Sequence, residues 1–328
     1  MTERVALDAP LDQARGLHVV TLGTAAGPAI RSECPGIATA IVVDGRFYLV
    51  DFGLGVTRAA HAAGLRGENL QACFVTHLHS DHVAEIPAYL LWNWGRPVQG
   101  FTETVRILGP GSANPHAGSV GIHGLVEHVL QAYSYDIDVR IVDEGRPPLY
   151  DLVQVEEIDL PTSAAEADGE HTPQMDPFVV YEDELVRVSA ILVEHPPIFP
   201  AFAFRFDTAY GSVVVSGDTT ESLNTSTLAS GADLLVHEAV NLDFYRARDF
   251  GPEFLNHQEI SHTTPAGVGR VATRAGAARV VLSHLAGVAT DAEWIAGVAA
   301  EYAGPVSVAH PGEVYTVVPA QAPATSPA

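Results

Sequence analysis

The sequence has no lysine, only two cysteines and no long apolar run. Its 17 basic residues are all arginines, they stand against 40 acidic residues, and the formal net charge is -23. A surface this acidic repels phosphate backbones, so composition alone disfavours nucleic acid as a partner. Cys34 and Cys73 are too few for a disulfide framework and form no CxxC pair. That usage favours a reducing compartment, the cytoplasm.

No segment approaches the roughly 18 uninterrupted apolar residues of a membrane-spanning helix, and the first residues lack the apolar centre of a signal peptide. We therefore expect no membrane partner. At 328 residues and 47% hydrophobic content, the chain is long and apolar enough to bury a large core.

Short runs rich in β-branched residues alternate with helical patterns along the chain. Strands are expected at 17–23, 38–44, 46–53, 72–77, 104–109, 187–195, 201–206, 212–218, 233–238, 279–284 and 314–318, and helices at 83–94, 120–133, 263–275 and 292–302. This mixture predicts a layered α/β fold in a single domain over 1–318. An acidic, proline-flanked insertion is expected at 161–177 and a disordered tail at 319–328.

The segment 76–82, with the sequence THLHSDH, directly follows an apolar run and is dense in metal-binding side chains. Side chains two apart in an extended chain point the same way, so His77 and His79 can bind one ion. Asp81 and His82 follow where the chain turns into a helix, and they can face a second ion. Imidazole and carboxylate groups suit zinc. Because two ligands per ion are too few, other segments must complete both sites.

Three later strands are expected to end at a metal-binding side chain. One stops at His195 before two prolines, one at Asp218 after a glycine turn, and one at His284. The carboxyl ends of strands are where α/β folds commonly assemble their sites. Together with the first motif, these residues suffice for two ions if one carboxylate bridges them.

The HxHxDH pattern at 77–82 and the order of the later candidates resemble the metallo-β-lactamase superfamily. The branch that the chain resembles contains ribonuclease Z and the metallo-β-lactamase-type arylsulfatases. Further landmarks of that branch match the segments TLGT at 21–24, VDFG at 50–53, SGDT at 216–219 and HTT at 262–264. The resemblance spans most of the chain and implies an αββα sandwich, with the metals at one edge between the sheets.

The resemblance also implies a role for each candidate residue. One zinc would be held by His77, His79 and His195, the other by Asp81, His82 and His284, and Asp218 would bridge them, with manganese or iron as possible replacements. A hydroxide shared by the metals would be the nucleophile, and Asp81 could also orient it. His262 would lie near the leaving group, where it could give up a proton, and Glu238 would hold His262 by a hydrogen bond.

These roles predict a metal-dependent hydrolase of a small-molecule ester, with aryl sulfate or a phosphodiester as substrate, and they leave a homodimer open. The alternative is a tRNA 3′-end processing endoribonuclease. In ribonuclease Z an arm that grips tRNA separates the third histidine motif from the aspartate motif, and the segment 195–218 leaves room only for two strands and a turn. Glu33 also places an acid in a loop where RNA would prefer none.

Several aromatic residues near the predicted ligands have two interpretations. They either pack in the core or form an apolar wall beside the metals that suits an aryl or acyl leaving group. The residues concerned are Tyr89, Trp92, Trp94, Phe199 and Phe202.

Overall fold

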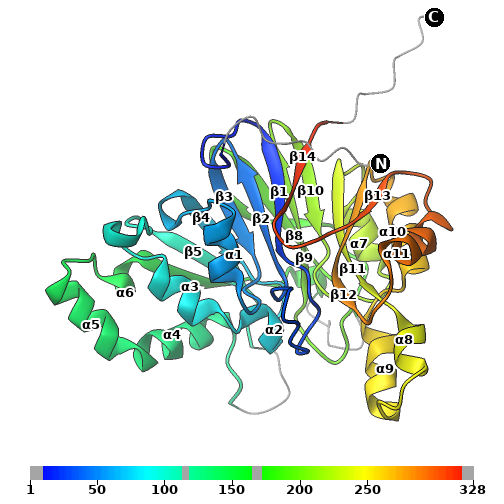
Figure 1. Cartoon of the computed structure of the whole chain (residues 1–328), viewed down its shortest axis with the longest axis horizontal. Helices are drawn as coiled ribbons and strands as arrows, with labels where there is room; N and C mark the ends of the chain where they lie inside the picture. The colour runs from blue at the N-terminus through cyan, green and yellow to red at the C-terminus, as the bar shows by residue number, and fades with distance from the viewer. Residues whose placement is uncertain (1–9, 113–117, 165–171, 320–328) are drawn as a thin grey trace, which may run out of the picture.

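The computed structural model describes residues 10–112, 118–164 and 172–319. Two seven-stranded sheets pack face to face, with helices on both outer faces (Figure 1). The first sheet has the order β14 (Glu313–Val317), β1 (Leu17–Gly23), β2 (Ala38–Val43), β3 (Arg46–Val50), β4 (Leu70–Phe74), β5 (Val105–Gly109) and β6 (Val153–Glu157). The second has the order β13 (Val306–Val308), β12 (Val280–Ala286), β11 (Leu234–Val240), β10 (Gly211–Val215), β9 (Phe202–Thr208), β8 (Val186–Leu192) and β7 (Phe178–Glu182). The predicted αββα sandwich is confirmed.

The helices fall into two outer layers and one projecting unit. Over the first sheet lie α1 (Val56–Ala62), α3 (Ile86–Trp92), α4 (Ile122–Ala132), α5 (Ser134–Asp143) and α6 (Leu149–Leu152). Over the second lie α7 (Leu223–Leu228), α10 (Pro265–Ala275) and α11 (Asp291–Ala299). The short helix α2 (Ser80–Val83) and the projecting pair α8 (Leu242–Arg246) and α9 (Pro252–Ser261) lie at one end of the sandwich (Figure 1).

Strand β1 shows why both faces of the sheets are covered. All of its residues are buried. Leu17 and Val19 belong to the core between the sheets, whereas Val20 and Leu22 belong to the core under the first helical layer. Side chains alternate between the faces of a strand, so an uninterrupted apolar run must be buried on both sides. The site is therefore built at the edge of a rigid, doubly covered frame.

The structure differs from the sequence prediction at several helices. The helix expected over 83–94 is divided into α2 and α3, with Pro87 in the first turn of α3. Asp81 and His82 thus lie inside a helical turn rather than before it. The helix expected from 263 begins at Pro265, since proline suits the first turn. Helices α1, α5, α6, α7, α8 and α9 were not predicted.

Only part of the predicted insertion at 161–177 can be placed, because residues 165–171 lie outside the described residues. On either side of them, Ala164 and Met175 are buried. The backbone N–H of Met175 donates to Asn224 Oδ1 at 3.3 Å, which fixes this flank against α7. The predicted tail, apart from residue 319, also lies outside the described chain. Among the described residues, no helix has the length and apolar character needed to cross a membrane.

Candidate metal centre and active site

The loop that carries the HxHxDH pattern runs from the end of β4 into α2. His79 is the N-cap of α2, and Asp81 and His82 lie within that short helix. His77 and His82 are completely buried. The Nε2 atom of His77 lies 2.9 Å from Nδ1 of His79, so both rings present nitrogen atoms to the same point.

The second sheet supplies the remaining candidates. His195 follows β8, and its Nδ1 lies 2.8 Å from the carbonyl oxygen of Ser261, which leaves Nε2 directed at the site. Asp218 follows β10 and is buried. His284 does not end its strand as expected: β12 continues to Ala286, and the pairing with β11 skips His284. His284 has a φ of 44°, so a β-bulge directs its side chain toward the site.

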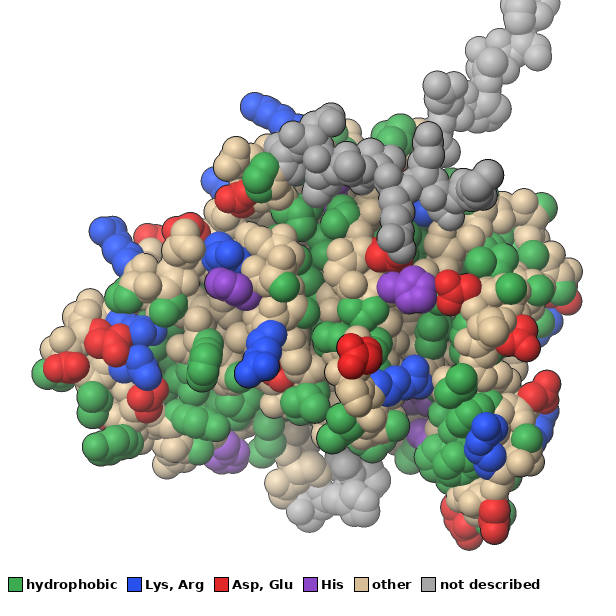
Figure 2. All heavy atoms as spheres, viewed as in Figure 1, with side chains coloured by type: hydrophobic (Ala, Val, Ile, Leu, Met, Phe, Trp, Pro, Cys, Tyr) green, Lys and Arg blue, Asp and Glu red, His purple; other side chains and the backbone are tan. Residues whose placement is uncertain are grey.

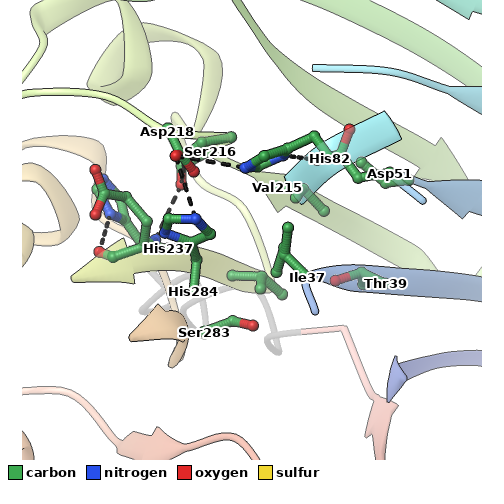
Figure 3. A pocket seen from close by; sticks show the side chains of 14 residues that line it. Ile37, Thr39, Asp51, His82, Val215, Ser216, Asp218, His237, Ser283 and His284 are labelled. Atoms are coloured by element: carbon green, nitrogen blue, oxygen red, sulfur yellow. Dashed lines mark hydrogen bonds and ion pairs between the residues drawn. The ribbon is translucent and has the colours of Figure 1, made fainter. Parts of the chain in front are cut away.

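The carboxylate of Asp218 lies at the centre of the site. Its Oδ2 atom is 3.2 Å from Nε2 of His284 and 3.4 Å from Nε2 of His82. The Nε2 atoms of His77 and His195 each lie 3.9 Å away. Figure 3 shows Asp218 between His82 and His284, with Asp51 behind His82. The structure thus brings together residues from both sheets that are far apart in sequence.

The candidates form two groups that suit divalent metal. Potential ligand atoms of His77, His79, His195 and Asp218 lie within 4.8 Å of one another, as do those of Asp81, His82 and His284. A third group, Asp218, His262 and His284, overlaps these two. Among the described residues, the Nε2 atoms of His82 and His284 and the Oδ1 atom of Asp218 are buried without a hydrogen-bond partner. Buried polar atoms normally have partners, so these atoms fit a cation. The first two groups contain all seven residues that were predicted as ligands.

Burial sets the protonation of the first group. It lowers the pKa of His77 well below its usual value and lowers the pKa of His195 to about 3, in both cases chiefly by desolvation. Both rings are therefore neutral near pH 7, and a neutral imidazole is the form that binds metal. Burial acts against ionisation of Asp218, but the neighbouring rings of His284 and His82 hold its pKa well below the usual range. The first group therefore combines neutral imidazoles with a buried anion, whereas burial of His82 is outweighed by the carboxylates of Asp218 and Asp51, which raise the pKa of that ring well above its usual value.

Asp51 has a supporting role that the sequence analysis missed. Its Oδ2 lies 2.8 Å from Nδ1 of His82 and accepts a hydrogen bond of 2.9 Å from the Thr76 hydroxyl. Its Oδ1 accepts from the backbone N–H of Thr76 at 2.8 Å. Carboxylates that hold the second ring nitrogen of a ligating histidine fix the ring and raise its basicity. The available signal was an acid directly after a strand, in the segment VDFG.

We expect Asp51→Asn to lower metal affinity by about 10–100-fold, because the amide cannot accept from all three present donors. The measurement is competition with a chromogenic chelator. Asp183→Asn is the matched control, since Asp183 accepts from Leu185 N–H and Tyr48 O–H outside the site. Equal affinities of the Asp51 variant and the wild type would contradict this role.

His262 and Glu238 form a buried pair beside the metal groups. The Nδ1 atom of His262 lies 3.0 Å from Glu238 Oε1, and that oxygen also accepts from the backbone N–H of Thr219 at 3.0 Å. Burial lowers the pKa of His262, but the Glu238 carboxylate outweighs it and raises the pKa to about 9. The predicted contact between the two residues is present. His262 is therefore protonated near pH 7 and has a proton to give.

An open cleft of about 760 Å³ gives access to these groups. Asp81, Asp218, His262 and His284 line it together with residues of α8 and α9. Of the described residues that line it, Asp81 and Asp218 are the only carboxylates, and Arg31 contributes a positive charge. A second, small cavity of about 20 Å³ lies on the other side of Asp218, between the sheets (Figure 3).

The aromatic residues singled out in the sequence do not line this cleft. Tyr89, Trp94 and Phe202 are buried in the cores, and Trp92 is 73% exposed. Phe199 is partly buried and packs against the core between the sheets. The apolar wall beside the metal groups is formed instead by four aromatic residues of α8, α9 and their connection: Phe244, Tyr245, Phe250 and Phe254.

A helix-covered double sheet that gathers metal-binding side chains from both sheets at one edge defines a class of metal-dependent enzyme. Residues 31–255 match the family described as the metallo-beta-lactamase superfamily. A ribonuclease Z of Mycolicibacterium gilvum is 31% identical over 276 residues, covering 82% of this chain and 84% of that protein. A ribonuclease Z of Mycobacterium avium is 29% identical over 298 residues, covering 89% and 95%.

Solved structures agree on the fold. Human tRNase Z, short form, superimposes with a TM-score of 0.62 at 19% identity, covering 92% of this chain and 99% of that one. The chain belongs to the metallo-beta-lactamase superfamily, because residues 31–255 match that family and a relative that is 31% identical covers 82% of the chain. This confirms the prediction of that superfamily and of a metal-dependent hydrolase acting on ester bonds. The comparisons give no support to the aryl sulfate interpretation.

The prediction that nucleic acid is disfavoured and that a small-molecule ester is the substrate was wrong. The relatives are named for ribonuclease activity, and they match over most of the chain. The net charge gave a wrong prediction because it sums the charges of the whole surface. Among the described residues that line the cleft, the only carboxylates are the two candidate ligands Asp81 and Asp218. Glu33 is exposed and is not one of those lining residues.

Proposed function

We propose that this protein is a phosphodiesterase that cleaves RNA in the manner of ribonuclease Z, removing the 3′ extension of a tRNA precursor. The observation that carries the proposal is the combination of the two Asp218-centred metal groups with the His262–Glu238 pair in one open cleft. Relatives named ribonuclease Z support RNA as the substrate class. Such a substrate belongs to the cytoplasm, in keeping with two free cysteines.

The metals would be held as the two groups suggest. His77, His79 and His195 would bind one ion, Asp81, His82 and His284 the other, and Asp218 would serve both. Imidazole and carboxylate ligands favour zinc, with manganese or iron as alternatives. When bound, such ions polarise a phosphoryl oxygen and make water acidic enough to attack near neutral pH.

Residues of the chain itself hold the side chains of the active site in position, and one of them would donate a proton. His262 presents its protonated ring to the cleft, where it would donate a proton from Nε2 to the oxygen that leaves phosphorus. Glu238 keeps Nδ1 of that ring occupied by a hydrogen bond of 3.0 Å, which fixes its orientation. Asp81 has its Oδ2 held by the backbone N–H of Gly27 at 2.9 Å. These contacts hold the side chains in place before substrate arrives.

Between His195 and Asp218, a segment that the structure describes throughout, no arm projects from the fold. Strands β9 and β10 form a tight hairpin there, with Thr208 paired to Gly211. RNA would have to be held by other parts of the cleft. Arg31 donates from Nη2 to the carbonyl oxygens of Leu285 and Gly287 at 2.8 and 3.2 Å, and no carboxylate of the described chain pairs with it. Its charge is therefore available to a phosphate.

The test is cleavage of a precursor tRNA with a 3′ extension by zinc-loaded protein, resolved on a denaturing gel. We expect one defined product pair, no cleavage of the mature tRNA, and a KM that rises with salt because phosphate contacts release counterions. Protein that carries two metal ions per chain yet leaves the precursor intact would refute the proposal.

A further inference from the structure

The unit formed by α8, α9 and their connection, residues 242–261, carries a cluster of aromatic rings that faces the cleft. The rings of Phe250 and Phe254 are stacked, with centroids 5.3 Å apart and planes 28° apart. Tyr245 contacts both at 5.3 and 5.5 Å, and Phe244 lies 5.2 Å from Tyr245. We call these four residues the aromatic wall. All four line the same cleft as Asp81, Asp218 and His262.

The aromatic wall is not part of the cores that hold the fold together. Phe250 and Phe254 are 42% and 37% exposed and belong to none of the buried clusters of the described chain. Of the buried clusters in the described chain, Tyr245 packs against the small one of Ala26, Val240 and Ala286. Hydrophobic side chains gather over the projecting unit at the lower right of Figure 2. Large apolar side chains left open beside a reaction centre commonly mark a binding surface.

The charges around the aromatic wall favour a ligand that carries phosphate. The Arg248 guanidinium lies 3.7 Å from the ring centroid of Phe244, and no described carboxylate pairs with it. Arg31 lines the cleft as well. The acids on the same unit, Asp243, Asp249, Glu253 and Glu259, are not among the described residues that line the cleft, and Glu259 pairs with Arg246. Arg248 also lies outside that lining, beside Phe244. A flat apolar surface with uncompensated arginines nearby is the combination on which unpaired nucleotides stack.

We propose that the aromatic wall binds an unpaired nucleobase next to the phosphodiester bond that is cleaved. The inference rests on the proposed function and narrows it, because it states that the RNA bound at the reaction centre is single-stranded. A base stacked on Phe250 and Phe254 places its own phosphate toward the metal groups, since both line one cleft. Helix α9 ends at Ser261, directly before His262, so the wall holds the nucleotide on the side of the leaving oxygen.

The experiment combines a protein variant with a change in the RNA. The double variant Phe250→Leu with Phe254→Leu keeps apolar volume but removes both rings, and Tyr135→Ala, 85% exposed on α5, is the control outside the cleft. The substrates are a precursor RNA with an unpaired 3′ extension and a set in which an abasic nucleotide replaces each base flanking the cleaved bond in turn. Values of kcat and KM are measured for every pair.

We expect the double variant to raise KM for the intact RNA by about 5- to 150-fold, the range that corresponds to loss of base stacking. At one or two positions, the abasic nucleotide should raise KM for the wild type and for Tyr135→Ala by a factor similar to that caused by the double variant. At the same positions it should raise KM of the double variant only slightly further. The inference would be overturned if, at every position, the abasic nucleotide raised KM by the same factor in the double variant as in the wild type. It would also be overturned if no abasic nucleotide raised KM for the wild type.

Failure of the proposed function gives a different pattern. If wild type with two metal ions cleaves no RNA, the same oligoribonucleotides are tested for binding by fluorescence anisotropy. Tight binding that falls about 5- to 150-fold both in the double variant and with the abasic nucleotide would keep the aromatic wall as a base-binding site. Equal binding by wild type and the double variant would reject it as well.

Discussion

Asp218→Ala is expected to remove metal from both groups of the site and to abolish cleavage. The Oδ2 atom of Asp218 lies 3.2 to 3.9 Å from the Nε2 atoms of four histidines that come from both groups. Loss of this carboxylate, which lies between the two groups, removes the buried anion that would balance the charge of bound cations. The drop in metal affinity should exceed the 10–100-fold typical for losing a supporting hydrogen bond.

Metal content after dialysis, measured by inductively coupled plasma mass spectrometry, gives the result independently of activity. Asp207→Ala is the matched control, because Asp207 lies on β9 and pairs with Arg205. It should retain the wild-type metal content. Retention of one full equivalent by Asp218→Ala would show that the two groups bind independently and that Asp218 belongs to one of them.

His262→Ala is expected to keep the metal content and to lower kcat by about 10²–10⁴-fold, the usual contribution of a positioned acid. The pH profile provides the second readout. Since the pKa of His262 is raised to about 9, the protonated form predominates below that value and is lost as the pH rises through it. Wild-type activity should therefore fall above about pH 9, and the variant should lack this alkaline limb.

The variant Glu238→Gln separates the positioning of the His262 ring by Glu238 from the effect of the Glu238 charge on proton donation by His262. The amide can still accept a hydrogen bond from Nδ1, but it removes the charge that raises the pKa of His262. The alkaline limb should therefore move to lower pH, with a smaller loss of kcat than in His262→Ala. If His262→Ala instead lost its metal, His262 would be a ligand rather than a proton donor. A potential ligand atom of His262 lies within 4.8 Å of those of Asp218 and His284, so the metal content of His262→Ala distinguishes a ligand from a proton donor.

The clustering of the candidate ligands was predictable from sequence because it depends on local patterns. Four of its members occur within six residues, and the other three follow apolar runs that form strands in the structure. A sheet that is covered on both faces requires long apolar runs, and the candidate ligands from the second sheet lie where such runs end or bulge. The bulge at His284 was not visible, since its residue sequence looks like an ordinary strand end.

The features that the sequence could not provide depend on contacts between distant segments. Asp51 contacts His82, which lies 31 residues later in the sequence, and nothing in the segment VDFG indicates that His82 is its partner. Helix α9 has only Gln258 and Ser261 buried, so it lacks the apolar stripe by which amphipathic helices are recognised. The charge of the cleft is likewise a property of the fold, because total charge does not tell which side chains line one cavity.

The most direct test of the account is a titration of metal-free protein with zinc while cleavage of a precursor tRNA and bound metal are both measured. The account predicts binding of two ions per chain, with activity appearing as the second site fills. Full activity in metal-free protein, or saturation at one ion per chain with full activity, would contradict a centre built on a carboxylate shared by two metals.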